Sequence, residues 1–266
     1  MTAMDGDSIS AARSEVDSPN ADWHRRVVGR SLHGAQRRSI DRGARLVRAA
    51  AKVLEKTHGE SLTVQDVADE AGQSLRTLYQ YFESKDDLLL AVFEEAQRTY
   101  ARLIQGAIAA LDDPLERLAG GVIASARMPT LHAKAGVDRG LSRLRLQLGQ
   151  VEPELVARSQ EPVTSLFRVL VAEALEASPE SPMRIDAATY FVCSLRTSFI
   201  ISMTLGNEYA VELPDVIDLS SFCLGGLGFD RPRAWHEEID ARLELSGTDG
   251  RSILRRLAKE PDGVKR

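Results

Sequence analysis

The sequence predicts an all-α protein in which an N-terminal three-helix unit with a helix-turn-helix layout precedes a larger helical body. Three observations support this prediction. Apolar residues recur in steps of three and four, helix-capping residues precede these runs, and no segment alternates polar and apolar residues as a half-exposed strand would. With 266 residues, 43% of them hydrophobic, the chain can bury a sizeable core.

The first predicted helix covers Ser39–Lys56. One apolar stripe runs along it and its basic residues lie off that stripe, as on an amphipathic helix; the stripe consists of Ile40, Ala44, Val47, Ala51 and Leu54. Residues 1–36 lack such a pattern, and we therefore expect them to form a flexible leader.

Two short helices joined by a glycine-containing turn follow. Thr63, with Asp66 three residues later, forms a capping box for a helix over Thr63–Glu70. Gly72 tolerates the backbone conformation that ends this helix, and Ser74 is a good N-cap for the next one. In this layout the second helix of the pair can enter the major groove of DNA.

Caps and prolines divide the remainder into further helices. Ser84 with Asp87 repeats the capping pattern and starts a helix predicted to end near Ile108. The other expected helices run from Asp113 to Pro129, from Asp138 to Gln150, from Val163 to Ala177, from Ile185 to Leu205 and from Asp215 to Leu227. We accordingly assign 37–84 to the helix-turn-helix domain, 85–229 to the helical body, and 230–266 to a polar C-terminal extension with helices at 233–245 and 251–259.

Charge is unevenly distributed along the chain. Residues 23–58 contain ten Lys or Arg and two acidic residues, a net charge of +8; because the whole chain carries −5, the remainder carries −13. A basic end on an acidic body is typical of a protein that presents one end to nucleic acid. A solvated arginine-rich helix face would give the same composition.

The composition also bears on location and cofactors. Cys193 and Cys223 have no metal-ligand spacing and lie in apolar stretches, which favours buried thiols in a reducing cytosol over a redox switch. Residues 1–20 lack the apolar core of a signal peptide, and the longest apolar run, near Phe199–Leu205, is too short to span a membrane. We expect a cytoplasmic protein with no cofactor and no metal.

The run Thr77-Leu-Tyr-Gln-Tyr-Phe-Glu-Ser-Lys85 resembles the signature of the TetR family of transcriptional regulators. The resemblance is specific over about residues 39–90 and architectural over 91–229. It implies a DNA-binding helix-turn-helix domain followed by an all-helical domain that binds an effector and forms a dimer. Gln73 departs from the family pattern, where Val is common, and Leu75-Arg76 replaces the usual small or polar pair.

The predicted DNA contacts centre on the second helix of the pair. Leu78 and Phe82 are four residues apart and should face the core, which leaves Arg76, Thr77, Tyr79, Gln80 and Tyr81 for DNA. Arg76 is the best base reader, because its guanidinium can bond both acceptors of a guanine. Ser74, at the start of this helix, is included in the predicted contact set. Leu75 suits either the core or a thymine methyl group.

Other contacts follow from the resemblance or from charge. The family pattern implies that Tyr79 reaches the groove wall or a base, and that Thr63, Thr77, Tyr81 and Lys85 contact phosphates. Arginines ahead of the first helix could form an arm along the DNA; of these, Arg37 and Arg38 are the strongest candidates, ahead of Arg25, Arg26 and Arg30. A disordered tail is the alternative.

The resemblance also implies a homodimer and a ligand pocket. We expect the dimer to form through about 163–177 and 185–205, because the second segment is apolar on too many sides for a surface helix. Candidate pocket residues for a small, apolar effector are Phe93, Tyr100, Met128, Leu131, His132, Leu144, Leu148 and Phe167. Each would serve equally as plain core.

Two other classes of function remain open at this point. An all-α enzyme would need a site that no recognisable motif reveals, because the chain has no glycine-rich phosphate loop and its five histidines are scattered. An architectural DNA-binding protein would bind without sequence preference and ignore small molecules. The predicted function is a TetR-like repressor that binds a palindromic operator as a dimer and is released by a small effector.

Overall fold

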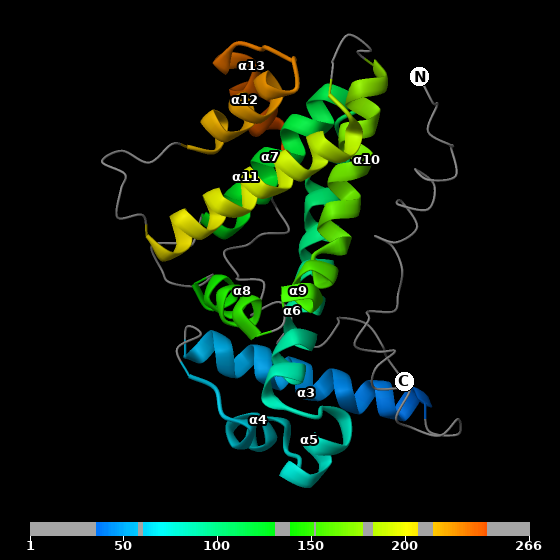
Figure 1. The fold of residues 1–266 in the computed structure, drawn as a ribbon, viewed down its shortest axis with the longest axis vertical. Helices are drawn as coiled ribbons and strands as arrows, with labels where there is room; N and C mark the ends of the chain where they lie inside the picture. The colour runs from blue at the N-terminus through cyan, green and yellow to red at the C-terminus, as the bar shows by residue number, and fades with distance from the viewer. Residues whose placement is uncertain are drawn as a thin grey trace. The chain divides into compact units, whose positions relative to one another are not determined.

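The computed structural model describes residues 36–57, 61–130, 139–151, 153–177, 183–206 and 215–243. These residues form α-helices and connecting turns without any strand, which confirms the predicted all-α class (Figure 1). The helices are α3 (Gln36–Lys56), α4 (Val64–Ala71), α5 (Leu75–Tyr81), α6 (Lys85–Ala107), α7 (Pro114–Thr130), α8 (Arg139–Val151), α9 (Pro153–Ser159), α10 (Glu161–Ala177), α11 (Ile185–Leu205), α12 (Val216–Gly226) and α13 (Arg233–Arg242).

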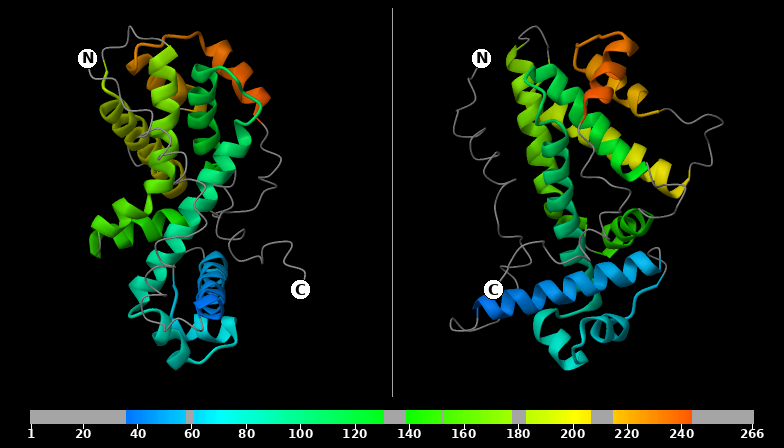
Figure 2. Two further views of the ribbon diagram at one scale, coloured as in Figure 1. Left: turned by 90° about the vertical axis from the view of Figure 1, so that its right-hand side faces the viewer. Right: turned by 180° about the vertical axis from the view of Figure 1, so that it is seen from behind.

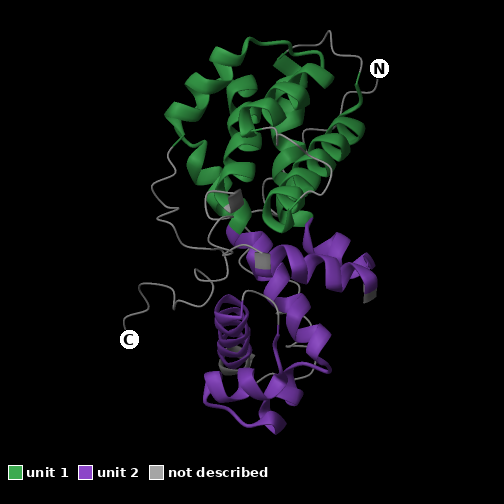
Figure 3. Ribbon diagram, turned by 90° about the vertical axis from the view of Figure 1, so that its left-hand side faces the viewer, with its two compact units in different colours: residues 1–18, 100–134, 161–250 green, residues 19–99, 135–160, 251–266 purple. Residues whose placement is uncertain are grey.

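The chain divides into two compact units (Figure 3). We call residues 19–99, 135–160 and 251–266 the head unit, and residues 1–18, 100–134 and 161–250 the body unit. The described part of the head unit holds α3, α4, α5, the first part of α6, α8 and α9. The sequence predicted a boundary between 84 and 85 and placed α8 in the body; the observed boundary lies inside α6 instead, between Thr99 and Tyr100.

In the head unit α3 packs on α4, α4 packs on α5, and α8 packs on α9. Its small core includes the apolar residues Leu46, Ala50, Val67, Leu78 and Phe82. Four polar residues are buried in the same unit: Glu94, Gln97, Ser142 and Ser159. Helix α3 begins at Gln36, three residues earlier than predicted, because Gln and Arg are good helix formers. Arg37 and Arg38 therefore belong to the first turn of a helix, and the prediction that they precede it as an arm is wrong.

In the body unit α7 packs against α10, α11, α12 and α13, as Figure 2 shows from two sides. Gly120 and Gly121 of α7 permit this close packing. A Cβ atom on Gly121 would lie 2.8 Å from Leu170 Cδ1 of α10, and one on Gly120 would lie 2.8 Å from Leu111 Cδ1.

Prolines account for the main errors in the predicted helix boundaries. Pro153 was taken as the end of the preceding helix, but it begins the seven-residue α9, because proline fits the first position of a helix, where no N–H is needed. Pro162 likewise lies inside the first turn of α10. Pro129 does not stop α7, which includes it and ends at Thr130.

The described part of the predicted C-terminal extension, residues 230–243, packs into the body unit. Helix α13 contacts α7 and α12, and its His236 and Ile239 are 0% and 1% exposed. Ser220 Oγ lies 3.0 Å from His236 Nδ1, and burial lowers the pKa of this histidine. The sequence analysis did not predict this packing, because residues 230–243 are mostly polar.

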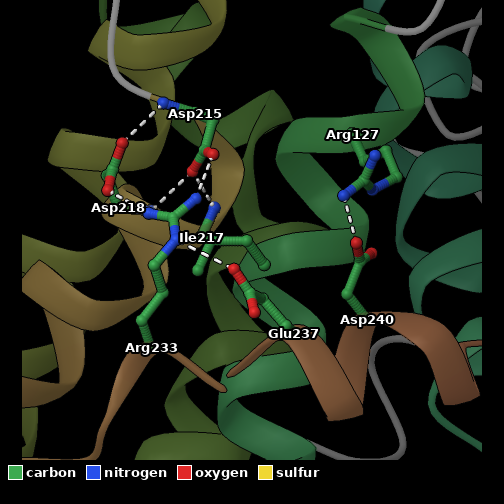
Figure 4. Close-up of polar contacts among 7 residues, drawn as sticks. All are labelled: Arg127, Asp215, Ile217, Asp218, Arg233, Glu237 and Asp240. Atoms are coloured by element: carbon green, nitrogen blue, oxygen red, sulfur yellow. Dashed lines mark hydrogen bonds and ion pairs between the residues drawn. The ribbon is translucent and has the colours of Figure 1, made fainter. Parts of the chain in front are cut away.

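Ion pairs fix α13 to the body unit (Figure 4). Arg233 binds Asp215, Asp218 and Glu237, at 2.6 Å for Asp218 Oδ1 and 2.9 Å for Glu237 Oε1. Arg127 of α7 binds Asp240. Arg242 Nη1 lies 2.9 Å from Glu116 Oε1. Asp215 is also the N-cap of α12, so one carboxylate both caps a helix and holds its neighbour.

Gly72 is the residue whose backbone the helix-turn-helix turn constrains most. It ends α4 at φ 61° and ψ 38°, in the left-handed region, and a Cβ atom there would meet nothing within 4 Å. We expect Gly72→Ala to lower the free energy of unfolding by about 1–2 kcal/mol through backbone strain alone. Urea unfolding followed by circular dichroism measures this.

Gly106→Ala is the matched control. A Cβ atom on Gly106 would also meet nothing within 4 Å, but this glycine lies inside α6 and has no positive φ. There the substitution should stabilise the protein by about 0.5–1 kcal/mol. Equal effects of the two substitutions would contradict the strain assigned to Gly72.

Candidate nucleic-acid interface

Thr63 and Asp66 form the capping box that the sequence predicted at the start of α4. The Asp66 N–H donates to Thr63 Oγ1 at 3.1 Å, and the Thr63 N–H donates to Asp66 Oδ2 at 3.1 Å. The Thr63 hydroxyl also donates to Asp66 Oδ2, at 2.6 Å, and these bonds hold the pKa of Asp66 below its usual value. A phosphate oxygen accepts hydrogen bonds, so it would have to displace Asp66 to receive this hydroxyl proton.

The turn after α4 is closed by its own backbone. The Gln73 N–H donates to the Ala68 carbonyl at 2.9 Å, and the Gly72 N–H donates to the Asp69 carbonyl at 3.1 Å. These bonds satisfy carbonyls at the end of α4 and set the direction in which α5 begins.

Glu70 links α4 to the basic helix α3. It binds Lys52 and Lys56, with Lys56 Nζ 2.7 Å from Glu70 Oε2, and the two ammonium groups lower its pKa. Two of the ten cations counted in the basic segment are therefore paired within the head unit. Arg42 and Arg45 of α3 are exposed and add positive charge to the head unit.

Helix α5 presents a polar face to solvent. Arg76 and Gln80 are exposed and Tyr79 is 50% exposed, as expected from their spacing around the buried Leu78. The Thr77 N–H donates to Ser74 Oγ at 3.1 Å, and the two hydroxyls lie 2.9 Å apart. Ser74 therefore serves as the N-cap of α5, in agreement with the sequence prediction.

One predicted contact residue lies differently from expectation, and a second had been left open. Tyr81, which was assigned to the outward face, is 9% exposed, because it lies three residues after Leu78 and shares its inward side. Its ring belongs to the core of the head unit. Leu75, for which both directions remained open, is half-buried.

Lys85 is the first residue of α6 and is exposed. The capping pattern predicted around it is present: the Asp87 N–H donates to Ser84 Oγ and the Glu83 N–H donates to Asp87 Oδ2, both at 3.0 Å. The α5–α6 connection is thus rigidly hydrogen-bonded on either side of Lys85. The side chains of Arg37 and Arg38, and the whole of Arg25, Arg26 and Arg30, lie outside the described residues.

The predicted pocket residues fall into both units. Tyr100, Met128 and Phe167 are buried in the body unit, whereas Phe93, Leu144 and Leu148 are buried in the head unit; Leu131 and His132 lie outside the described residues. The structure brings Tyr100 and Phe167 together around Arg196, which is 5% exposed. The sequence analysis did not assign Arg196 to any site, although an arginine inside the apolar run Ile185–Leu205 is the signal that could have identified it.

Two further observations concern the chemistry available. Among the described residues no group of three His, Cys, Asp or Glu side chains is placed to hold a metal ion. Cys223 is buried and Cys193 half-buried. Burial raises the pKa of both thiols, to about 12 for Cys223.

Comparison with known proteins finds matches to bacterial transcriptional regulators. Residues 46–92 match the family model described as bacterial regulatory proteins, tetR family. The HTH-type transcriptional regulator Rv1255c of Mycobacterium tuberculosis (strain ATCC 25618 / H37Rv) is 26% identical over 169 residues, which are 63% of this chain and 78% of the relative. HbdR of Aromatoleum sp. (strain CIB) is 33% identical over 82 residues, 31% of this chain and 36% of HbdR.

Solved structures share the fold at lower identity. RolR in complex with resorcinol is 23% identical with a TM-score of 0.59, over 78% of this chain and 96% of RolR. FadR of Bacillus subtilis in complex with stearoyl-CoA is 18% identical with a TM-score of 0.50, over 69% of this chain and 96% of FadR. At these identities the likeness concerns the fold alone.

Proposed function

We propose that the chain is a transcriptional regulator of the TetR type rather than an enzyme, and that it is a repressor that binds a palindromic operator as a homodimer and is released by a small effector. The main support is the exposed polar face of α5, where Arg76, Tyr79 and Gln80 surround a buried Leu78. A guanidinium and an amide are the side-chain groups that read base edges in the major groove.

The homodimer is best supported by α11. By length and composition this helix could cross a membrane. Only 33% of its most apolar 18-residue stretch is buried in the protomer. Tyr190 and Phe191 are 67% and 52% exposed, and Phe222 of the neighbouring α12 is 68% exposed. Large exposed aromatic side chains on adjacent helices favour a protein interface over a membrane or solvent.

This interface keeps one of the two segments predicted from the sequence and replaces the other. Segment 163–177 was expected to contribute, but most of its side chains are already buried against α7 and α11. Helix α12 takes its place in the proposal because it offers Phe222. Segment 185–205 is retained, with its aromatic residues as the contacting groups.

We infer the type of effector and the cytoplasmic location from the likeness to TetR-type regulators. RolR was solved with resorcinol and FadR with stearoyl-CoA, so regulators of this fold accept both small aromatic and acyl ligands. In the proposed mechanism an effector bound in the helical body favours the conformations that cannot hold the operator, and so shifts the population away from DNA. A regulator of this kind acts on DNA in the cytoplasm.

The test is selection of binding sites from random-sequence duplex DNA at two salt concentrations, followed by sequencing. A palindromic consensus is the expected result. Salt-sensitive binding without a consensus would replace the repressor by an architectural DNA-binding protein. No binding at either salt concentration would refute the DNA-binding proposal.

Arg76 and Lys85 separate base reading from phosphate binding. We expect Arg76→Ala to relax discrimination at one base pair of the selected site by about 1–3 kcal/mol. Lys85→Ala should instead weaken binding to all sequences alike and reduce the salt slope by about one. Titrations of the consensus and of single-base variants measure both; unchanged binding by Arg76→Ala would place Arg76 outside the groove.

A further inference from the structure

Arg196 is a buried cation in the core of the body unit. It projects from α11, is 5% exposed, and its guanidinium carbon lies 5.8 Å from the centroid of the Tyr100 ring and 5.4 Å from that of Phe167. Two aromatic faces attract a cation through their quadrupoles, but they carry no formal charge. The desolvation of a buried guanidinium is offset fully only by an anion with matching hydrogen bonds.

Within the described residues no carboxylate forms an ion pair with Arg196. Other arginines of the body unit do have such partners: Arg117 with Glu173, Arg127 with Asp240, Arg168 with Asp186, and Arg242 with Glu116. All four are more exposed than Arg196. The Nε of Arg196 is buried and finds no hydrogen-bond acceptor among the described residues.

The two thiols near Arg196 do not supply the missing charge. The guanidinium acts on both Cys193 and Cys223, and its positive charge favours their thiolates. Burial outweighs it and raises the pKa of Cys223 to about 12 and that of Cys193 above its ordinary value. Both thiols are therefore protonated and neutral near pH 7.

Thr189 provides a second buried polar group on the same face of α11. It precedes Arg196 by seven residues, which is two helical turns or about 10.5 Å along the axis. Its Oγ1 is buried and has no hydrogen-bond partner in the part of the chain that the structure describes, whereas the hydroxyl of Thr204 on the same helix donates to the Ile200 carbonyl at 2.8 Å. Thr189 thus leaves unused the local bond that a helical threonine commonly makes.

We propose that Arg196 binds the anionic group of the effector, and that this effector is a small organic monoanion with an apolar body, in the simplest case a carboxylic acid. The proposal rests on the proposed function, of which it specifies the ligand class. The planar guanidinium suits a carboxylate or phosphate held by two parallel hydrogen bonds. Tyr100 and Phe167 contact the apolar part next to the charge, and Thr189 donates to a polar atom farther along the ligand.

The first experiment measures the melting temperature without ligand. Because no carboxylate among the described residues pairs with this cation, Arg196→Met should raise Tm, and Arg196→Gln should not lower it. Arg184→Gln is the matched control, since Arg184 is exposed at the N-cap of the same helix. A fall of Tm in both Arg196 variants would show that the arginine stabilises the folded protein, and would overturn the proposal.

The second experiment compares acids with amides of the same shape. Benzoate and hexanoate are added to the wild type at matched concentrations beside benzamide and hexanamide, and phenyl phosphate distinguishes phosphate from carboxylate binding. We expect acids alone to raise Tm and to release the selected operator. Arg196→Met should abolish this preference, and Arg196→Lys should keep it with at least about tenfold weaker affinity. Equal responses to acids and amides across the panel would overturn the proposal.

The order of measurement separates the two proposals. Operator binding by the wild type is established first, without any acid. If no operator is found, the proposed function fails. If the operator is bound and acids release it no better than amides, only the assignment of Arg196 fails.

Discussion

Replacing Tyr190 and Phe222 together by glutamate is expected to make the protein monomeric and to lower its operator affinity by about 10²–10⁴-fold. Both side chains are more than 60% exposed and lie on the adjacent helices α11 and α12. Charges placed in the apolar centre of an interface would be desolvated without partners. A palindrome is bound tightly because the second head binds as part of the same molecule, and a monomer loses that advantage.

Light scattering after gel filtration measures the oligomeric state, and titration of the selected operator measures the affinity. Leu146→Glu is the control, because Leu146 is an apolar residue 46% exposed on α8, outside the proposed interface. It should remain dimeric and bind normally. A dimer that survives both aromatic substitutions would move the interface away from α11 and α12.

Phe82→Ala is expected to lower the free energy of unfolding of the head unit by about 3–5 kcal/mol. The ring is 1% exposed and follows directly after α5, where it is buried like Leu78 of the same helix. Its removal leaves a cavity that the short helices around it fill only in part. The loss is large enough to unfold a small unit at physiological temperature.

Tyr79→Ala should have the opposite outcome to Phe82→Ala: weaker DNA binding with little change in stability. Tyr79 is half-exposed on the same helix, so its loss should change stability by less than about 0.5 kcal/mol while weakening DNA binding. Urea unfolding and operator titration of both variants measure the two effects. If Tyr79→Ala were the more destabilising change, the orientation of α5 would have to be revised.

The sequence predicted the helices well wherever a cap and an apolar stripe agree. Thr63 with Asp66, Ser74, and Asp215 each mark a helix start that the structure places at the same residue. These signals are local, since each depends on hydrogen bonds within four residues. The likeness of residues 46–92 to the tetR family model could also be predicted from residues 77–85, because that signature is a short continuous run.

Features that depend on tertiary contacts were not predictable. The packing of α13 on α7 and α12 buries Ile239 and brings His236 to Ser220, which a polar composition does not reveal. The spacing of three residues from Leu78 is compatible with an inward Tyr81, but the packing of α5 on the core is what decides between that side and solvent. That no described carboxylate pairs with Arg196 can be recognised only when the positions of the neighbouring helices are known.

The buried Cys223 thiol can report transient opening of the body unit. Cys193 and Cys223 are the two cysteines of the chain, and near pH 7 both are held as unreactive thiols. A maleimide would modify Cys223 only in molecules whose body had transiently opened, so its rate of labelling reports the equilibrium between closed and open forms. A ligand bound beside Arg196 would slow that labelling, which allows occupancy to be followed without attaching any reporter group.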